Sequence, residues 1–116
     1  MSHKKSWEEG RSTLPKYRSK SAGIHNGVWM RCLNSEGVFA RQLDEAGIQW
    51  LYEPCGFKTS LGRYHPDFFL PEFNIWVEVK GSWIAEKSRA KMEAFRREFN
   101  KCLIVVHQSE LEGVRY

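Results

Sequence analysis

The stretch at residues 64–83, YHPDFFLPEFNIWVEVKGSW, decides the fold because it holds two apolar runs separated by a turn. The runs cover residues 68–70 and 75–79, and the residues between them have the composition of a tight turn. The pattern therefore predicts a β-hairpin. Each run also carries an acid, since Asp67 directly precedes the first and Glu78 lies within the second. An ionised carboxylate among apolar neighbours is costly unless a positive group pairs with it.

Strand geometry predicts how these acids lie. Side chains alternate between the two faces of a strand, so Glu78 and Lys80 share a face. If the hairpin closes between Leu70 and Ile75, Asp67 lies directly opposite Glu78, and opposed residues have Cβ atoms about 4.5–5.5 Å apart. The hairpin alone then places two carboxylates side by side, with a lysine next to them.

A third acid is expected from a helix that begins near Asn34 or Ser35, which are good cap residues, and ends at Gly47. Glu36 falls on the apolar stripe of this helix and therefore points at the core. The other members of the stripe are Phe39, Ala40, Leu43 and Ala46.

Three converging carboxylates repel one another, and Lys80 alone cannot neutralise them. A hard divalent cation can, because Mg²⁺ prefers oxygen ligands and is commonly held by one or two carboxylates plus substrate phosphate. We expect Asp67, Glu78 and Glu36 to bind Mg²⁺, with Mn²⁺ as a substitute and the Val79 carbonyl as a further ligand. Such a site suits phosphodiester hydrolysis. Lys80 would orient the attacking water or offset negative charge in the transition state.

The rest of the chain predicts an α/β domain. Strands are expected at residues 48–53, 68–70 and 75–79, a second helix at 83–100, and a strand buried on both faces at 103–106, with residues 57–59 a candidate for a short further strand. The order is α-β-β-β-α-β, a mixed sheet flanked by helices.

Pro66-Asp67, followed after ten residues by Glu78-Val79-Lys80, resembles the PD-(D/E)XK nuclease pattern. Ser35-Glu36 and the segments 47–53, 66–71 and 80–83 are similar to the phage endonuclease I type of Holliday-junction resolvase, although residues 1–30 do not match. The resemblance implies a restriction-endonuclease-like fold and Mg²⁺-dependent cleavage of branched DNA that leaves a 5′-phosphate, carried out by a homodimer. It gives Glu36 the role of the first acid, Asp67 and Glu78 the metal-binding roles, and Lys80 that of the lysine.

The charge distribution also favours DNA as a partner. Residues 1–23 carry a net charge of +4, equal to that of the whole chain, so residues 24–116 are balanced. We expect a basic arm at 1–23, either a tether to phosphate or a solvated flexible tail, followed by a nuclease domain at 24–116. Candidate DNA contacts are Lys58, Arg63, His65, Gly81, Trp83, Lys87 and Lys91.

The chain has no long apolar run, and its three cysteines form no CxxC pair, so we expect a cytoplasmic protein without a membrane partner, in a bacterial host if the chain derives from a phage. Four alternatives remain open. The same core could belong to a sequence-specific nicking or homing-type endonuclease, or to a non-catalytic DNA-binding subunit. Glu78 and Lys80 could be a surface ion pair, and Glu36 an acid favoured by the helix dipole.

Overall fold

The computed structural model of the chain describes residues 21–81 and 84–111. Its centre is a mixed sheet with the strand order β3-β6-β7-β8. The first three strands pair antiparallel, and β8 runs parallel to β7. These strands are β3 (Leu51–Tyr52), β6 (Phe68–Leu70), β7 (Ile75–Lys80) and β8 (Cys102–His107).

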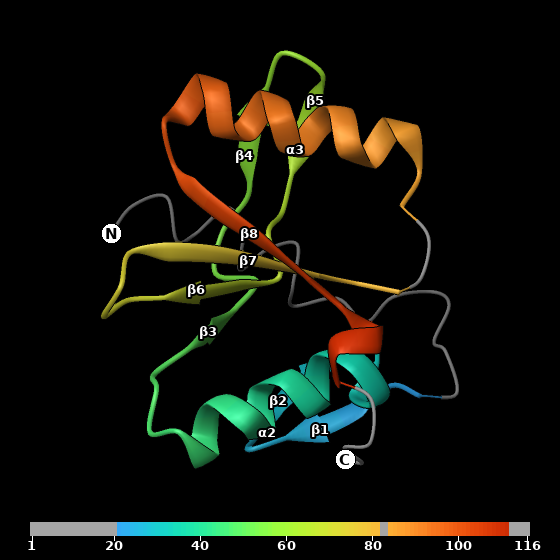
Figure 1. Cartoon of the computed structure of the whole chain (residues 1–116), viewed down its shortest axis with the longest axis vertical. Helices are drawn as coiled ribbons and strands as arrows, with labels where there is room; N and C mark the ends of the chain where they lie inside the picture. The colour runs from blue at the N-terminus through green and yellow to red at the C-terminus, as the bar shows by residue number, and fades with distance from the viewer. Residues whose placement is uncertain (1–20, 82–83, 112–116) are drawn as a thin grey trace.

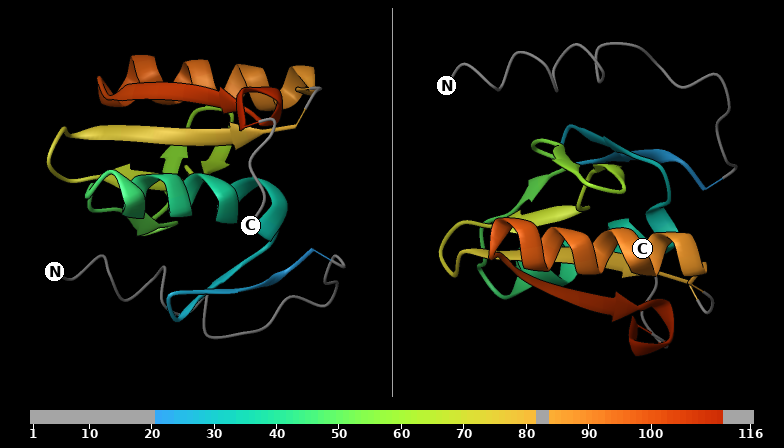
Figure 2. Two further views of the ribbon diagram at one scale, coloured as in Figure 1. Left: turned by 60° about the horizontal axis from the view of Figure 1, so that its bottom comes forward. Right: turned by 90° about the horizontal axis from the view of Figure 1, so that it is seen from above.

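A layer of secondary structure lies on each side of this sheet (Figures 1 and 2). One layer contains the turn η1, helix α2 and the hairpin β1–β2, and the other contains helix α3 and the hairpin β4–β5. The described part of the chain is therefore a mixed α/β domain with two α-helices. The elements of the two layers are β1 (Gly23–His25), β2 (Val28–Met30), η1 (Leu33–Gly37), α2 (Val38–Glu45), β4 (Phe57–Thr59), β5 (Gly62–Tyr64) and α3 (Glu86–Phe99), and η2 (Gln108–Leu111) follows β8.

The expected hairpin register is confirmed. Phe68 pairs with Val77 and Leu70 pairs with Ile75. Alternation along the strands divides the core in two, since Phe68 and Val77 pack in the α2 layer whereas Trp76 packs in the α3 layer. Glu78 shares the strand face of Trp76.

The first helix begins differently from the prediction. Residues 33–37 form one wide turn in which the Gly37 N–H bonds to the Cys32 carbonyl, and the regular helix starts only at Val38. Asn34 bonds through its side chain to the Ser21 hydroxyl and does not cap the helix. Gly47 does end it, with a φ of +72° that favours glycine.

Some other predictions were wrong in detail. The strand expected at 48–53 is reduced to two residues, and Ala46 is exposed because α2 ends before it. The strand at 103–106 is not buried on both faces, because β8 forms one edge of the sheet and Ile104 is 42% exposed. The hairpin β1–β2 was not predicted at all. Among residues 21–81 and 84–111, no helix has the length and apolarity needed to cross a membrane.

Candidate active site

The site is built around the end of strand β7 that β6 does not cover. The β6–β7 pairing stops at Phe68 and Val77, so the backbone of Val79 has no partner from β6. Asp67 takes that place, because its Oδ2 accepts a hydrogen bond from the Val79 N–H at 2.8 Å. The N–H and C=O of one strand residue point to the same side of the strand, so the Val79 carbonyl is directed to the side of Asp67.

Glu78 and Lys80 lie next to this contact. The Glu78 carboxylate is buried, with 6% of the residue exposed, and Lys80 Nζ lies 3.2 Å from its Oε2. The Lys80 side chain is 25% exposed, so its ammonium can reach both the carboxylate and a bound substrate. The hydrogen bond that Asp67 accepts from the Val79 N–H shows that the Asp67 side chain points across the end of the hairpin toward β7.

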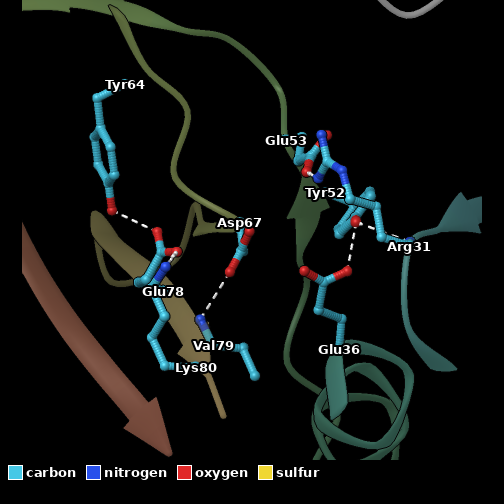
Figure 3. A network of polar contacts seen from close by, with 9 residues as sticks. All are labelled: Arg31, Glu36, Tyr52, Glu53, Tyr64, Asp67, Glu78, Val79 and Lys80. Carbon is cyan, nitrogen blue, oxygen red and sulfur yellow. Dashed lines mark hydrogen bonds and ion pairs between the residues drawn. The ribbon is translucent and has the colours of Figure 1, made fainter. Parts of the chain in front are cut away.

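Glu36 approaches from the other side. Glu36 is 8% exposed, as its position on the apolar stripe predicted. It belongs to the wide turn η1, which faces the sheet. Figure 3 shows Asp67 between Glu78 on one side and Glu36 on the other. Three acids from three separate segments are thus brought into one region.

The electrostatics of this region show a deficit of positive charge. Burial raises the pKa of Asp67 well above its ordinary value of 3.8, and the charges of Glu78 and Glu36 raise it further. The hydrogen bond from the Val79 N–H and the charge of Lys80 lower the pKa of Asp67, but they offset only part of the rise. Burial likewise raises the pKa of Glu36, although its hydrogen bond with Tyr52 and the charge of Arg31 act in the opposite direction. A cation bound among these carboxylates would relieve the repulsion.

The candidate metal donors in this region are carboxylate and carbonyl oxygen atoms. Within the two described ranges, no three His, Cys, Asp or Glu side chains form a group that could hold a metal ion by themselves. Mg²⁺ usually keeps several waters and takes only one or two carboxylates. Asp67, Glu78 and the Val79 carbonyl supply oxygen donors of this kind, and Glu36 lies close enough to influence the charge of Asp67.

Two tyrosines in the site were not predicted. The Tyr52 hydroxyl donates to Glu36 Oε1 at 2.5 Å, and the Tyr64 hydroxyl donates to Glu78 Oε1 at 2.5 Å. Burial foremost, followed by the charge of the neighbouring glutamate, raises the pKa of each phenol, so both remain protonated donors at neutral pH. Tyr64 comes three residues before Asp67, but a strand of three residues gives no periodic signal that would place its side chain.

An ion pair between an exposed arginine and a buried glutamate at the edge of this network was also missed. Glu53, 5% exposed, accepts a hydrogen bond from the guanidinium of Arg31, which lies on the segment after β2. Arg31 also donates its backbone N–H to the Tyr52 hydroxyl at 3.3 Å. The hairpin β1–β2 therefore contacts the carboxylates through Tyr52 (Figure 3).

Most of the predicted DNA contacts lie in the α3 layer. Lys58 and Arg63 are paired neighbours on the hairpin β4–β5, and both are exposed. Lys91 Nζ donates to the Arg63 carbonyl at 3.3 Å, and Lys87 is exposed on the same helix. Trp83 lies outside the described residues.

Two further candidates have defined surroundings. His65 is exposed, and its ring lies so close to Gly56 that a Cβ there would be 2.4 Å from His65 Nε2. Gly81 is exposed, and among the described residues a Cβ there would meet no atom nearer than 3.9 Å. Trp76, which lies on the face of Glu78, is only 6% exposed and is a core residue in edge-to-face contact with Phe57.

An apolar groove lies beside β3 and is distinct from the carboxylate site. Its volume is about 1490 Å³, and its lining is mainly apolar and aromatic, including Trp29, Trp50 and Phe69. Tyr52 borders it, but none of the three clustered acids does. This groove is therefore not the proposed metal site.

Comparison of the chain with models of protein families, with curated proteins and with solved structures gives no match. The functional argument consequently depends on the geometry of the site and on the motifs in the sequence.

Proposed function

We propose that this protein is a magnesium-dependent endodeoxyribonuclease with a restriction-endonuclease-like core, and that it acts preferentially on branched DNA. The observation that carries the proposal is the meeting of Asp67 and Glu78 at the uncovered end of β7, with Lys80 3.2 Å from Glu78. These are the acid, acid and lysine of the PD-(D/E)XK pattern. Their convergence supports a catalytic interpretation over that of a surface ion pair, because the two acids are 6% exposed each.

The chain's own residues have distinct roles in this proposal. Asp67, Glu78, Glu36 and the Val79 carbonyl would hold Mg²⁺, with Glu36 approaching from the opposite side. The bound ion would supply Lewis-acid activation of the scissile phosphate and of the attacking water. Lys80 would orient that water through its ammonium group and offset negative charge that develops on the phosphate.

The order of the elements supports the fold assignment. Helix α2 is followed by β3, β6 and β7, then by α3 and the parallel strand β8. This is the expected order α-β-β-β-α-β, with the short hairpin β4–β5 inserted between β3 and β6. The inserted hairpin is what brings Tyr64 to Glu78.

The same hairpin offers a surface for the DNA backbone. Arg63 directly precedes Tyr64, whose hydroxyl contacts Glu78, so an exposed guanidinium lies one residue from a side chain of the site. Lys58 is its cross-strand partner, and Lys91 contacts the Arg63 carbonyl. Cations on this surface would bind phosphates that flank the scissile bond.

The test is a cleavage assay with Mg²⁺ or Mn²⁺ on linear, nicked, flapped and four-way DNA. We expect cleavage by the wild-type protein, with four-way junctions cut in preference to linear duplex, and no cleavage by Asp67→Asn, Glu78→Gln or Lys80→Gln. Glu72→Gln is the matched control, because Glu72 is an exposed acid in the turn of the same hairpin. Full activity of any of the three site variants would refute the assignment.

Other outcomes of this assay identify the alternatives. Cutting at one fixed sequence in linear DNA would indicate a nicking or homing-type enzyme on the same core. Salt-dependent DNA binding without strand breaks in any divalent ion would indicate a non-catalytic subunit. We also propose that the enzyme is a homodimer that cuts both strands, and size-exclusion chromatography with light scattering distinguishes a dimer from a monomer.

A further inference from the structure

Each glutamate of the site receives a hydrogen bond from a different buried tyrosine. Tyr52 comes from β3 and is 6% exposed, and Tyr64 comes from β5 and is 8% exposed. In Figure 3 they lie on opposite sides of the site, each with its hydroxyl directed at a carboxylate. A phenylalanine would pack equally well in either core cluster, so packing does not account for the two hydroxyl groups.

The Tyr52 hydroxyl accepts one hydrogen bond and donates another. The Arg31 N–H donates to the Tyr52 oxygen at 3.3 Å, and a backbone N–H can only donate. The single hydroxyl proton of Tyr52 is therefore available for Glu36 Oε1, 2.5 Å away. The hydrogen bonds from Arg31 through Tyr52 to Glu36 connect the segment after β2 to the carboxylate.

We propose that Tyr52 and Tyr64 are positioning residues of the metal site, which hold the carboxylates of Glu36 and Glu78 in place around Asp67. This inference depends on the proposed function, because it assigns the two tyrosines to the same metal-dependent reaction. Neither tyrosine needs to touch metal or DNA. Each acts by restricting the rotation of a carboxylate that would otherwise move away from its like-charged neighbours.

The two tyrosines should differ in importance. Glu78 lies on the six-residue strand β7 and is also held by Lys80 at 3.2 Å. Glu36 lies on the single wide turn η1, and among the described residues its carboxylate has no ion pair like that between Glu78 and Lys80. Loss of the Tyr52 hydroxyl should therefore weaken metal binding more than loss of the Tyr64 hydroxyl.

The test compares Tyr52→Phe and Tyr64→Phe with the wild-type protein. Thr59→Val is the matched control, since it removes another buried hydroxyl, one that donates to the Gly62 carbonyl and lies away from the carboxylates. Mn²⁺ affinity is measured by electron paramagnetic resonance of the free ion, thermal unfolding is measured in EDTA, and kcat and KM are measured at several Mn²⁺ concentrations.

We expect the Mn²⁺ affinity of Tyr52→Phe to fall by about 10–100-fold, a typical loss for partners of metal-binding side chains. Tyr64→Phe should lose less, Thr59→Val should match wild type, and excess Mn²⁺ should restore cleavage by both phenylalanine variants. Wild-type Mn²⁺ affinity in both phenylalanine variants, or an equal loss in Thr59→Val, would overturn the inference while leaving the proposed nuclease intact. A wild-type protein that neither binds Mn²⁺ nor cleaves DNA would overturn the proposed function itself.

Discussion

The replacement of Asp67 by asparagine should stabilise the metal-free protein. In the folded state the pKa of Asp67 is raised above 3.8, first by burial and then by Glu78 and Glu36. A raised folded-state pKa favours folding only while the carboxyl is protonated, and this contribution is lost as the pH rises through that pKa. At pH 7.5 the Asp67 carboxyl therefore lowers the free energy of unfolding relative to its value at acidic pH. Asparagine removes the charge and keeps an oxygen that can accept from the Val79 N–H.

The size of the effect follows from linkage. Each unit by which the folded-state pKa is raised lowers the free energy of unfolding at neutral pH by about 1.4 kcal/mol. For a chain of this length about 1 kcal/mol corresponds to roughly 4 °C in Tm. The Tm of Asp67→Asn in EDTA should therefore exceed that of wild type by about 5 °C for each unit of elevation, and the difference should shrink as the pH is lowered toward 4.

Magnesium should reverse the order of the Tm values of wild type and Asp67→Asn. A ligand present at tenfold its Kd stabilises the folded state by about 1.4 kcal/mol, so the Tm of wild type should rise by about 5 °C, whereas Asp67→Asn should respond little. Differential scanning fluorimetry in EDTA and in Mg²⁺ measures both effects.

Asp44→Asn is the control with the opposite sign. Although burial acts to raise the pKa of Asp44, its hydrogen bonds with Trp50 and His25 outweigh this and lower it, so the loss of its charge should destabilise the fold. If Asp67→Asn is destabilised in EDTA as Asp44→Asn is, the reasoning about a repulsive carboxylate cluster is refuted.

Three further predictions follow from the same structure. Lys80→Gln should lower kcat by about 10²-fold or more while Mn²⁺ affinity stays within a fewfold of wild type, which kinetics and metal titration together check. The double variant Lys58→Ala/Arg63→Ala should bind DNA more weakly, with a plot of log K against log[salt] that is flatter by about 0.9 for each lost phosphate contact; an unchanged slope would remove the hairpin β4–β5 from the interface. Gly47→Ala should lower stability by about 1 kcal/mol, because φ is +72° and no neighbouring atom lies within 4 Å of the added Cβ, and activity per folded molecule should not change.

The hairpin register could be predicted from the sequence because a two-residue period and a clear turn leave few alternatives. Once Leu70 pairs with Ile75, every other pair along β6 and β7 is determined, and the strand face of Glu78 follows. Glu36 was predictable for a related reason, since a helical period placed it on the apolar stripe. Both results come from local periodicity acting on residues near one another in the chain.

The partners of these acids could not be predicted in the same way. Tyr52 and Tyr64 reach Glu36 and Glu78 only after β3 and the hairpin β4–β5 pack against the rest of the domain. Those strands have two and three residues, which is too short for a periodic signal. The exposure of β8 was also missed, because an apolar sequence does not show whether a strand is central or at an edge.

The central claim is that Asp67 and Glu78 together bind a divalent metal. Diffraction from crystals soaked in Mn²⁺, with data collected at the manganese absorption edge, tests it most directly. We predict an anomalous peak at metal–oxygen bonding distance, about 2.1 Å, from the carboxylates of Asp67 and Glu78 and from the Val79 carbonyl. A peak bound by other residues, or none at this end of β7 at saturating Mn²⁺, would contradict the account.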